Sequence, residues 1–326
     1  MHRSIRTALA ILGSFGVGVM AQQPPVAAPP ADSYEGHLAT AKQAAGFEFP
    51  GTLDRLCIAP ATMVGANITA ADRALWYAEP VKVFDNLYWL GTKIHSSWAL
   101  TDKQGIIILD TLFNYAAAPE IVDGLKSLHL DPKNIKYVIV SHGHGDHDEG
   151  ARLLQDVYGA RIVMGAADWD MIERGPEMPG GKPRRDLVGT DGQLITVGGN
   201  TVRLVSTPGH TPGTLSMLFT VRDHGRPLTV AYSGGTAIAG IVHDAARLSQ
   251  YSDSQRKMGR EAAAAGATIL MSNHTEFDSA YIKVRLLAAR RAGEPHPFEV
   301  GGDAVQRYFK MGDECAQAAR MRATGP

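Results

Sequence analysis

The sequence has few cysteines, no excess of charge and no internal repeat. Of 326 residues only Cys57 and Cys315 are cysteines, and neither lies in a C-x-x-C motif or among histidines, which argues against a thiolate metal site. The formal net charge is −1 and no basic tract stands out, so the composition gives no sign of nucleic acid as a partner. The function must therefore be sought in motifs rather than in composition.

Long apolar runs are also missing, apart from one near the N-terminus. Residues 8–21 follow the basic start MHRSIRT and form an apolar stretch too short to span a bilayer comfortably. Because this stretch ends in small residues, we predict that residues 1–21 are a signal peptide, with an uncleaved membrane anchor as the alternative. We therefore expect a soluble monomer in the periplasm or outside the cell, without stable membrane association after signal cleavage.

Two further segments are predicted after the signal peptide. Residues 22–50 are predicted to be a Pro/Ala-rich linker and N-terminal segment, because QQPPVAAPPADSYEG (22–36) favours extended chain. Residues 51–326 are predicted to form one domain. Two cysteines in an exported chain predict a disulfide between Cys57 and Cys315, with two unrelated buried thiols as the alternative.

Strand-like and helix-like patterns alternate along this domain. The predicted strands are 81–91, 96–102, 105–111, 135–140, 160–165, 193–199, 200–210, 213–221, 227–235 and 267–273. The predicted helices are 119–130, 149–159, 247–266, 278–292 and 303–322. Groups of strands in both halves, each followed by helices, predict an α/β fold in which two β-sheets pack together with helices outside.

Metal-binding residue types crowd the stretch SHGHGDHDEG (141–150), directly after a predicted buried strand. His142, His144, Asp146 and His147 fall within six positions, with glycine as the spacer. Glycine lets the backbone curl tightly, so that alternate imidazoles turn toward one point. Imidazole nitrogen and carboxylate oxygen are ligands that zinc prefers. The spacing therefore predicts a metal site at the end of this strand.

Two further histidines follow predicted strands in the same way. His210 lies in the turn STPGHTPGTLS, and His274 comes just after the short strand ATILMSN. Together with the first motif they give five histidines and one aspartate. Six ligands are too many for one tetrahedral zinc but suit two metals with three protein ligands each and open positions for water.

With HGHGDH and PGHTPG in place, the chain from about 80 to 320 resembles the metallo-β-lactamase superfamily. The resemblance implies an αβ/βα sandwich of two mixed β-sheets flanked by helices, with the metal site at the sheet edges. It also implies two Zn²⁺ ions per chain. The first zinc takes His142, His144 and His210, and the second takes Asp146, His147 and His274.

Within this superfamily the chain is most similar to subclass B3. Lactonases and glyoxalase-type thioesterases place a bridging aspartate in the stretch that is TVAYSGGTA (229–237) here, and the first two β-lactamase subclasses place a cysteine there. This chain has neither. The resemblance implies a β-lactamase that opens the β-lactam ring with a metal-bound hydroxide, which Asp146 orients as the catalytic residue.

Two other functions stay open. One is a hydrolase of the same fold that acts on a lactone, ester or thioester, against which the missing bridging aspartate counts. The other is a non-enzymatic periplasmic metal-binding protein, although three ligands per metal leave open positions that such a protein does not need.

The substrate contacts are predicted from positions near the metal motifs. Subclass B3 has serine hydroxyls just past the strand at 229–233, where this chain has a glycine pair ending at Gly235, followed by Thr236. We predict that Gly235 opens the pocket or that Thr236 replaces the hydroxyl, and that His95 faces the cleft. On this view, Gly235→Ser lowers the KM for penicillins by up to about a hundredfold.

Overall fold

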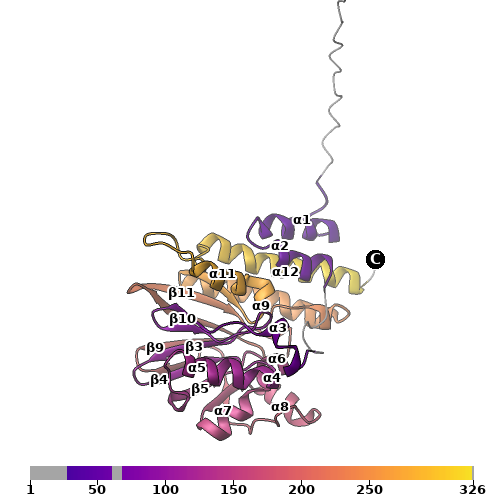
Figure 1. Cartoon of the computed structure of the whole chain (residues 1–326). Helices are drawn as coiled ribbons and strands as arrows, with labels where there is room; N and C mark the ends of the chain where they lie inside the picture. The colour runs from indigo at the N-terminus through magenta and orange to yellow at the C-terminus, as the bar shows by residue number, and fades with distance from the viewer. Residues whose placement is uncertain (1–27, 61–67, 325–326) are drawn as a thin grey trace, which may run out of the picture.

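Two β-sheets pack face to face, with helices on both outer faces (Figure 1). The computed structural model describes residues 28–60 and 68–324; the predicted signal peptide lies outside these residues. Within the described ranges, no helix combines the length and the apolar character needed to cross a membrane. The predicted sandwich fold is confirmed.

The first sheet has seven strands in the order β1-β2-β3-β4-β5-β6-β7. Its strands are β1 (Val81–Phe84), β2 (Leu87–Trp89), β3 (Trp98–Asp102), β4 (Gly105–Leu109), β5 (Ile135–Ile139), β6 (Arg161–Gly165) and β7 (Leu187–Gly189). The pairs from β1 to β4 are antiparallel and those from β4 to β7 are parallel. A tight turn divides the predicted strand 81–91 into a hairpin, and β7 was not predicted.

The second sheet has five strands in the order β12-β11-β10-β9-β8. Its strands are β8 (Leu194–Val197), β9 (Asn200–Ser206), β10 (Leu215–Asp223), β11 (Arg226–Ser233) and β12 (Ala267–Ser272). Only β11 and β12 pair in parallel. Both sheets are therefore mixed, as predicted.

The helices lie outside the sheets and in the connections at their ends. The helices and single turns are α1 (Tyr34–Ala45), α2 (Pro50–Leu53), η1 (Asp54–Ile58), η2 (Ala70–Asp72), α3 (Arg73–Trp76), α4 (Asn114–Ala116), η3 (Ala117–Val122), α5 (Asp123–Ser127), η4 (Pro132–Asn134), α6 (Gly145–Asp148), α7 (Ala151–Tyr158), α8 (Ala166–Arg174), η5 (Ala239–Ile241), α9 (Ala245–Ala264), α10 (Thr275–Asp278), α11 (Ala280–Leu287) and α12 (Gly302–Thr324). Side chains of α5, α7 and α8 pack on the first sheet, and those of α9 and α12 on the second.

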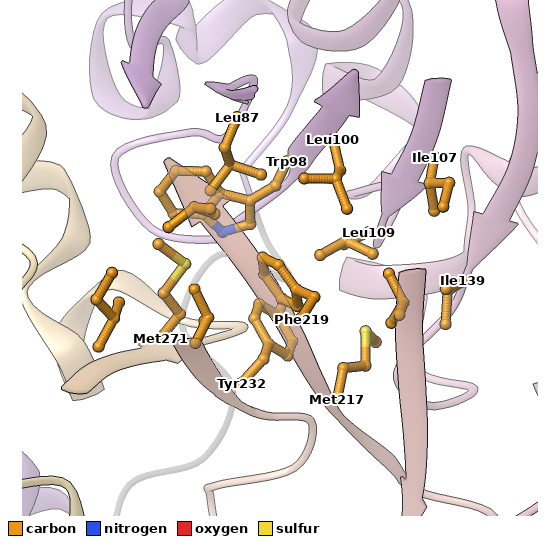
Figure 2. Packing of buried hydrophobic residues seen from close by; sticks show 14 of the residues in the cluster. Leu87, Trp98, Leu100, Ile107, Leu109, Ile139, Met217, Phe219, Tyr232 and Met271 are labelled. Carbon is orange, nitrogen blue, oxygen red and sulfur yellow. The ribbon is translucent and has the colours of Figure 1, made fainter. Parts of the chain in front are cut away.

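The space between the sheets holds the main apolar core (Figure 2). Successive side chains of a strand point to opposite faces, and β10 shows this clearly. Met217 and Phe219 point into the core between the sheets, whereas Leu218 packs with the helices outside. Trp89 and Trp98, predicted to be core residues, contact each other edge to face with ring centroids 4.8 Å apart.

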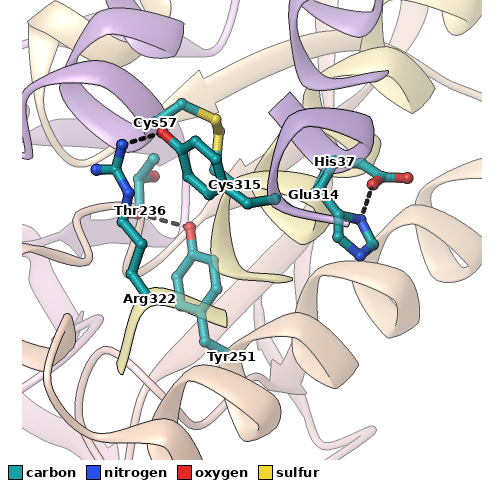
Figure 3. Close-up of a disulfide and its surroundings, with 8 residues drawn as sticks. His37, Cys57, Thr236, Tyr251, Glu314, Cys315 and Arg322 are labelled. Carbon is teal, nitrogen blue, oxygen red and sulfur yellow. Dashed lines mark hydrogen bonds and ion pairs between the residues drawn. A yellow bond between two sulfur atoms is a disulfide. The ribbon is translucent and has the colours of Figure 1, made fainter. Parts of the chain in front are cut away.

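The N-terminal segment is part of the folded unit. Helix α1 begins at Tyr34 and packs against α12, so the end of the predicted linker 22–36 is helical. The reason is burial, since Ala41 and Ala45 of α1 lie in one apolar cluster with α9 and α12. The predicted disulfide is confirmed: Cys57 of η1 is bonded to Cys315 of α12 (Figure 3).

Candidate metal centre

Histidines from three separate strand ends meet at one edge of the sandwich. His142 follows β5, His210 lies in the turn between β9 and β10, and His274 follows β12. Backbone hydrogen bonds join these ends: the Leu215 amide donates to the Ser141 carbonyl over 2.8 Å. Residues that are far apart in sequence are therefore held together by the sheets and not by the loops alone.

The first group consists of His142, His144 and His210. His210 Nε2 lies 3.0 Å from His142 Nε2 and 3.1 Å from His144 Nδ1. Zinc–nitrogen bonds of 2.0–2.1 Å place the donors of a tetrahedral site about 3.3–3.4 Å apart. The three nitrogens converge at nearly this spacing, so the group suits one zinc ion.

Backbone carbonyls fix the orientation of two of these rings. His142 Nδ1 donates to the Gly234 carbonyl at 2.8 Å, and His210 Nδ1 donates to the Ala237 carbonyl at 2.6 Å. With Nδ1 protonated, the Nε2 lone pair points into the group, which is the arrangement that holds metal-binding histidines in place.

The second group consists of Asp146, His147 and His274. Asp146 Oδ2 is 3.1 Å from His147 Nε2 and 3.2 Å from His274 Nε2, and the two histidine nitrogens are 3.2 Å apart. All three residues are buried. These spacings also suit a single tetrahedral ion. The structure thus brings all six sequence-predicted ligands together as two groups of three.

Asp110 supports the second group from behind. Its Oδ2 lies 3.4 Å from His147 Nδ1 and accepts a hydrogen bond from the Tyr232 hydroxyl at 2.8 Å. Its Oδ1 accepts from the Ser141 amide at 2.6 Å. A carboxylate behind a ligand histidine fixes the ring and raises its basicity. Ser141 also contacts this carboxylate with its hydroxyl, which agrees with a structural role.

The electrostatics of the two groups differ. Burial lowers the pKa of His142 and of His210 well below the usual value, and the neighbouring imidazoles lower both further. Burial opposes charge on Asp146 too, but His147 and His274 outweigh it and hold the pKa of Asp146 well below its usual range. The neutral imidazoles of the first group and the ionised Asp146 are forms that bind metals, whereas His147 must lose a proton to bind one, because Asp146 and Asp110 outweigh burial and raise its pKa to about 10.

Comparisons with known proteins agree with this geometry. Residues 90–225 match the metallo-beta-lactamase superfamily. BJP-1, a subclass B3 metallo-beta-lactamase of Bradyrhizobium japonicum, has a similar structure with a TM-score of 0.60. The two chains are 26% identical, and the match covers 74% of this chain and 93% of BJP-1. Residues 90–225 therefore resemble the metallo-β-lactamase superfamily, and the described residues have the fold of a subclass B3 enzyme.

Two curated proteins with similar sequences are named hydroxyacylglutathione hydrolase and not β-lactamase. A hydroxyacylglutathione hydrolase of Acidiphilium cryptum is 39% identical over 85 residues, which are 26% of this chain and 31% of that protein. A hydroxyacylglutathione hydrolase of Rhodopseudomonas palustris is 27% identical over 256 residues, 72% of this chain and 93% of that protein. The chain thus spans less than a third of the first protein and most of the second.

The glycine pair at the end of β11 lies against neighbouring segments, which counts against our prediction that it opens the pocket. A Cβ added to Gly235 would lie 2.8 Å from His210 Cβ and 2.9 Å from Thr214 Cγ2. At Gly234 it would lie 1.8 Å from the Leu215 carbonyl oxygen. The end of β11 approaches the His210 turn so closely that an added side chain would force its neighbours to shift, which counts against the expected gain from Gly235→Ser.

The prediction for Thr236 also finds no support in the structure. Its hydroxyl lies 2.9 Å from the Ser233 hydroxyl, 3.0 Å from that of Ser272 and 3.1 Å from that of Tyr308. These partners lie inside the protein, so the Thr236 hydroxyl forms its hydrogen bonds in the protein interior and not with a substrate. His95, predicted to face the cleft, is buried beside the second group, with Nε2 3.5 Å from Asp146 Oδ2.

One residue that supports the metal centre was missed from the sequence. Asp168 of α8 is fully buried and accepts hydrogen bonds from the Gly143 amide at 2.9 Å and the Gly213 amide at 2.8 Å. It therefore ties the HGHGDH loop to the PGHTPG turn. Nothing in the local sequence marks this aspartate, since its two partners lie in other segments.

A cleft lies beside His144 of the first histidine group. It has a volume of about 290 Å³. Its walls carry the apolar side chains Met171, Ile172 and Met178 together with the acidic Glu177. The cleft therefore gives solvent access to His144 of the first histidine group.

Proposed function

We propose that this chain is an exported, zinc-dependent β-lactamase that binds two zinc ions. The observation that carries the proposal is the end of β11. Neither a carboxylate nor a thiol follows Ser233 there, so Asp146, His147 and His274 make up the second group without a bridging ligand. This donor set is the one that the resemblance to subclass B3 implies. The similarity to BJP-1 over 93% of its length supports the same substrate class.

The chain's own residues would hold zinc and position a water molecule. When bound, zinc supplies Lewis acidity for the water and for the lactam carbonyl. Asp146 places Oδ2 among the donors of the second group, while Oδ1 is buried with no hydrogen-bond partner among the residues that the structure describes. We assign Oδ1 the role of accepting a hydrogen bond from the attacking water. His142 and His210 keep their donor nitrogens aimed through the Gly234 and Ala237 carbonyls.

The second candidate is a thioester hydrolase. The names of the Acidiphilium and Rhodopseudomonas relatives favour it. The absence of an aspartate after β11 counts against it, because the glyoxalase-type thioesterases that the chain resembles place their bridging ligand there.

The test is a substrate panel on zinc-loaded protein without its signal peptide. A penicillin, a cephalosporin, a carbapenem, an acyl lactone and a hydroxyacylglutathione thioester are compared at equal enzyme concentration. We expect hydrolysis of at least one β-lactam with a higher kcat/KM than for the lactone or thioester. Rapid thioester or lactone hydrolysis without any β-lactam turnover would replace the first candidate by the second.

A further inference from the structure

His95 is a seventh donor-type residue at the metal centre. It lies in the loop between β2 and β3, and its side chain is 1% exposed. Its Nε2 is 3.5 Å from Asp146 Oδ2, the same oxygen that His147 and His274 approach. Three imidazoles from three segments therefore surround one carboxylate oxygen.

The backbone holds His95 as firmly as it holds His274. The two residues pair as an isolated antiparallel bridge. On either side, the Ser96 amide donates to the Asn273 carbonyl and the Thr275 amide donates to the Ile94 carbonyl, both at 2.9 Å. The ring of His95 also packs edge-on against Phe113 at 5.2 Å. Its position next to the second group is thus built into the fold.

The spacing suits a shared metal better than a direct hydrogen bond. At 3.5 Å, the distance from His95 Nε2 to Asp146 Oδ2 exceeds the usual 2.7–3.2 Å range of N–H···O bonds by roughly 0.3 Å. It is close to the separation of about 3.3–3.4 Å between donors around a tetrahedral zinc. The ring centroids of His95 and His274 are 5.0 Å apart, close to the 5.1 Å between His147 and His274, and those of His95 and His147 are 6.2 Å apart.

We propose that His95 is a fourth protein ligand of the second metal ion. The inference rests on the metal site of the proposed function but not on its substrate. Asp146, His147, His274 and His95 together supply one oxygen and three nitrogens, and four protein ligands close a tetrahedral zinc site. The open position for substrate then belongs to the first ion, which has three histidine ligands. In this arrangement the second ion is held by protein ligands alone, and the first ion is the one that can contact substrate.

Cadmium-113 NMR tests the proposal without substrate. Protein labelled with ¹⁵N-histidine is loaded with two equivalents of ¹¹³Cd²⁺, and one-bond ¹¹³Cd–¹⁵N couplings identify the histidines bound to metal. We expect coupling to His95 Nε2 on the same cadmium as His147 and His274. The His95→Asn variant identifies this signal by its loss.

Zinc affinity provides the second readout. Removing a residue that only hydrogen-bonds to a metal ligand typically lowers metal affinity by 10–100-fold. We expect His95→Asn to weaken the second site by more than about a hundredfold and to leave the His142, His144 and His210 couplings unchanged. His95→Gln, which returns an amide oxygen near the Nε2 position, should recover part of the loss.

His224→Asn is the matched control, because the His224 side chain is 88% exposed and its φ of 51° is one that asparagine tolerates. It should bind two ions like the parent. The proposal is overturned if cadmium couples to His147 and His274 but not to His95 in the parent protein, whatever the variants do. Cadmium that couples to no histidine would overturn the metal site as well, whereas failure to hydrolyse β-lactams affects only the proposed substrate.

Discussion

Gly235 lies against His210, so its lack of a side chain bears directly on the first histidine group. We predict that Gly235→Ser lowers the zinc content of the protein and destabilises it by about 1–3 kcal/mol, the usual cost of overpacking. The reason is the 2.8 Å contact that a Cβ would make with His210 Cβ. Elemental analysis and thermal unfolding measure both effects.

Gly240→Ser is the control for this prediction, because an added Cβ there has no atom within 4 Å. It should bind zinc like the parent. If Gly235→Ser keeps its zinc and its stability, the close approach of β11 to the His210 turn has no role in shaping the site.

The six donors could be predicted from the sequence because their motifs are local. His142, His144, Asp146 and His147 lie within six positions, and their residue types alone indicate a metal. The closeness of Gly235 to His210 could not be predicted, since it depends on how the end of β11 meets another turn. The same is true of Asp168, whose partners Gly143 and Gly213 lie 25 and 45 residues away.

At the scale of elements, η3 carries a buried carboxyl group whose protonation should affect stability. Glu120 is fully buried, and Oε1 accepts a hydrogen bond from the Ala78 amide at 3.1 Å. Burial raises the pKa of Glu120 to about 8. The folded protein therefore keeps this proton between about pH 4.5 and 8, whereas the unfolded chain loses it, so the free energy of unfolding falls as the pH rises through this window.

We predict that Glu120→Gln removes this loss, because glutamine stays neutral and can still accept from the Ala78 amide. The variant should be more stable than the parent at pH 8, by a few kcal/mol and at most about 5, since each pKa unit corresponds to about 1.4 kcal/mol. The difference should shrink toward pH 4.5. Urea unfolding at several pH values measures it, and a pH-independent difference would rule out Glu120 as the cause.

Strands with strong patterns could be predicted, and elements that depend on distant partners could not. Alternating or continuous apolar runs predicted strands at the positions of β4, β5 and β9 to β12. The short strand β7 has only three residues, and α1 depends on burial against α12 at the far end of the chain. Neither shows a local signal strong enough to be recognised.

At the scale of the molecule, the disulfide joins the N-terminal segment to the last helix. Cys57 and Cys315 are separated by 258 positions. Replacing both by serine should lower the free energy of unfolding by about 2–5 kcal/mol, because the bond restricts a long loop in the unfolded chain. Guanidinium unfolding measures this. An unchanged midpoint would show that helix packing alone holds α1 and η1 in place.

The proposed function requires that this chain hold two zinc ions and hydrolyse a β-lactam. The most direct measurement starts from chelator-treated protein and follows penicillin hydrolysis while zinc is added in steps of a fraction of an equivalent. We expect no hydrolysis without zinc, and a rate that rises until two equivalents are bound and then stays constant. A rate that is already maximal at one equivalent contradicts the two-metal site, and no penicillin hydrolysis at any zinc level contradicts the proposed substrate.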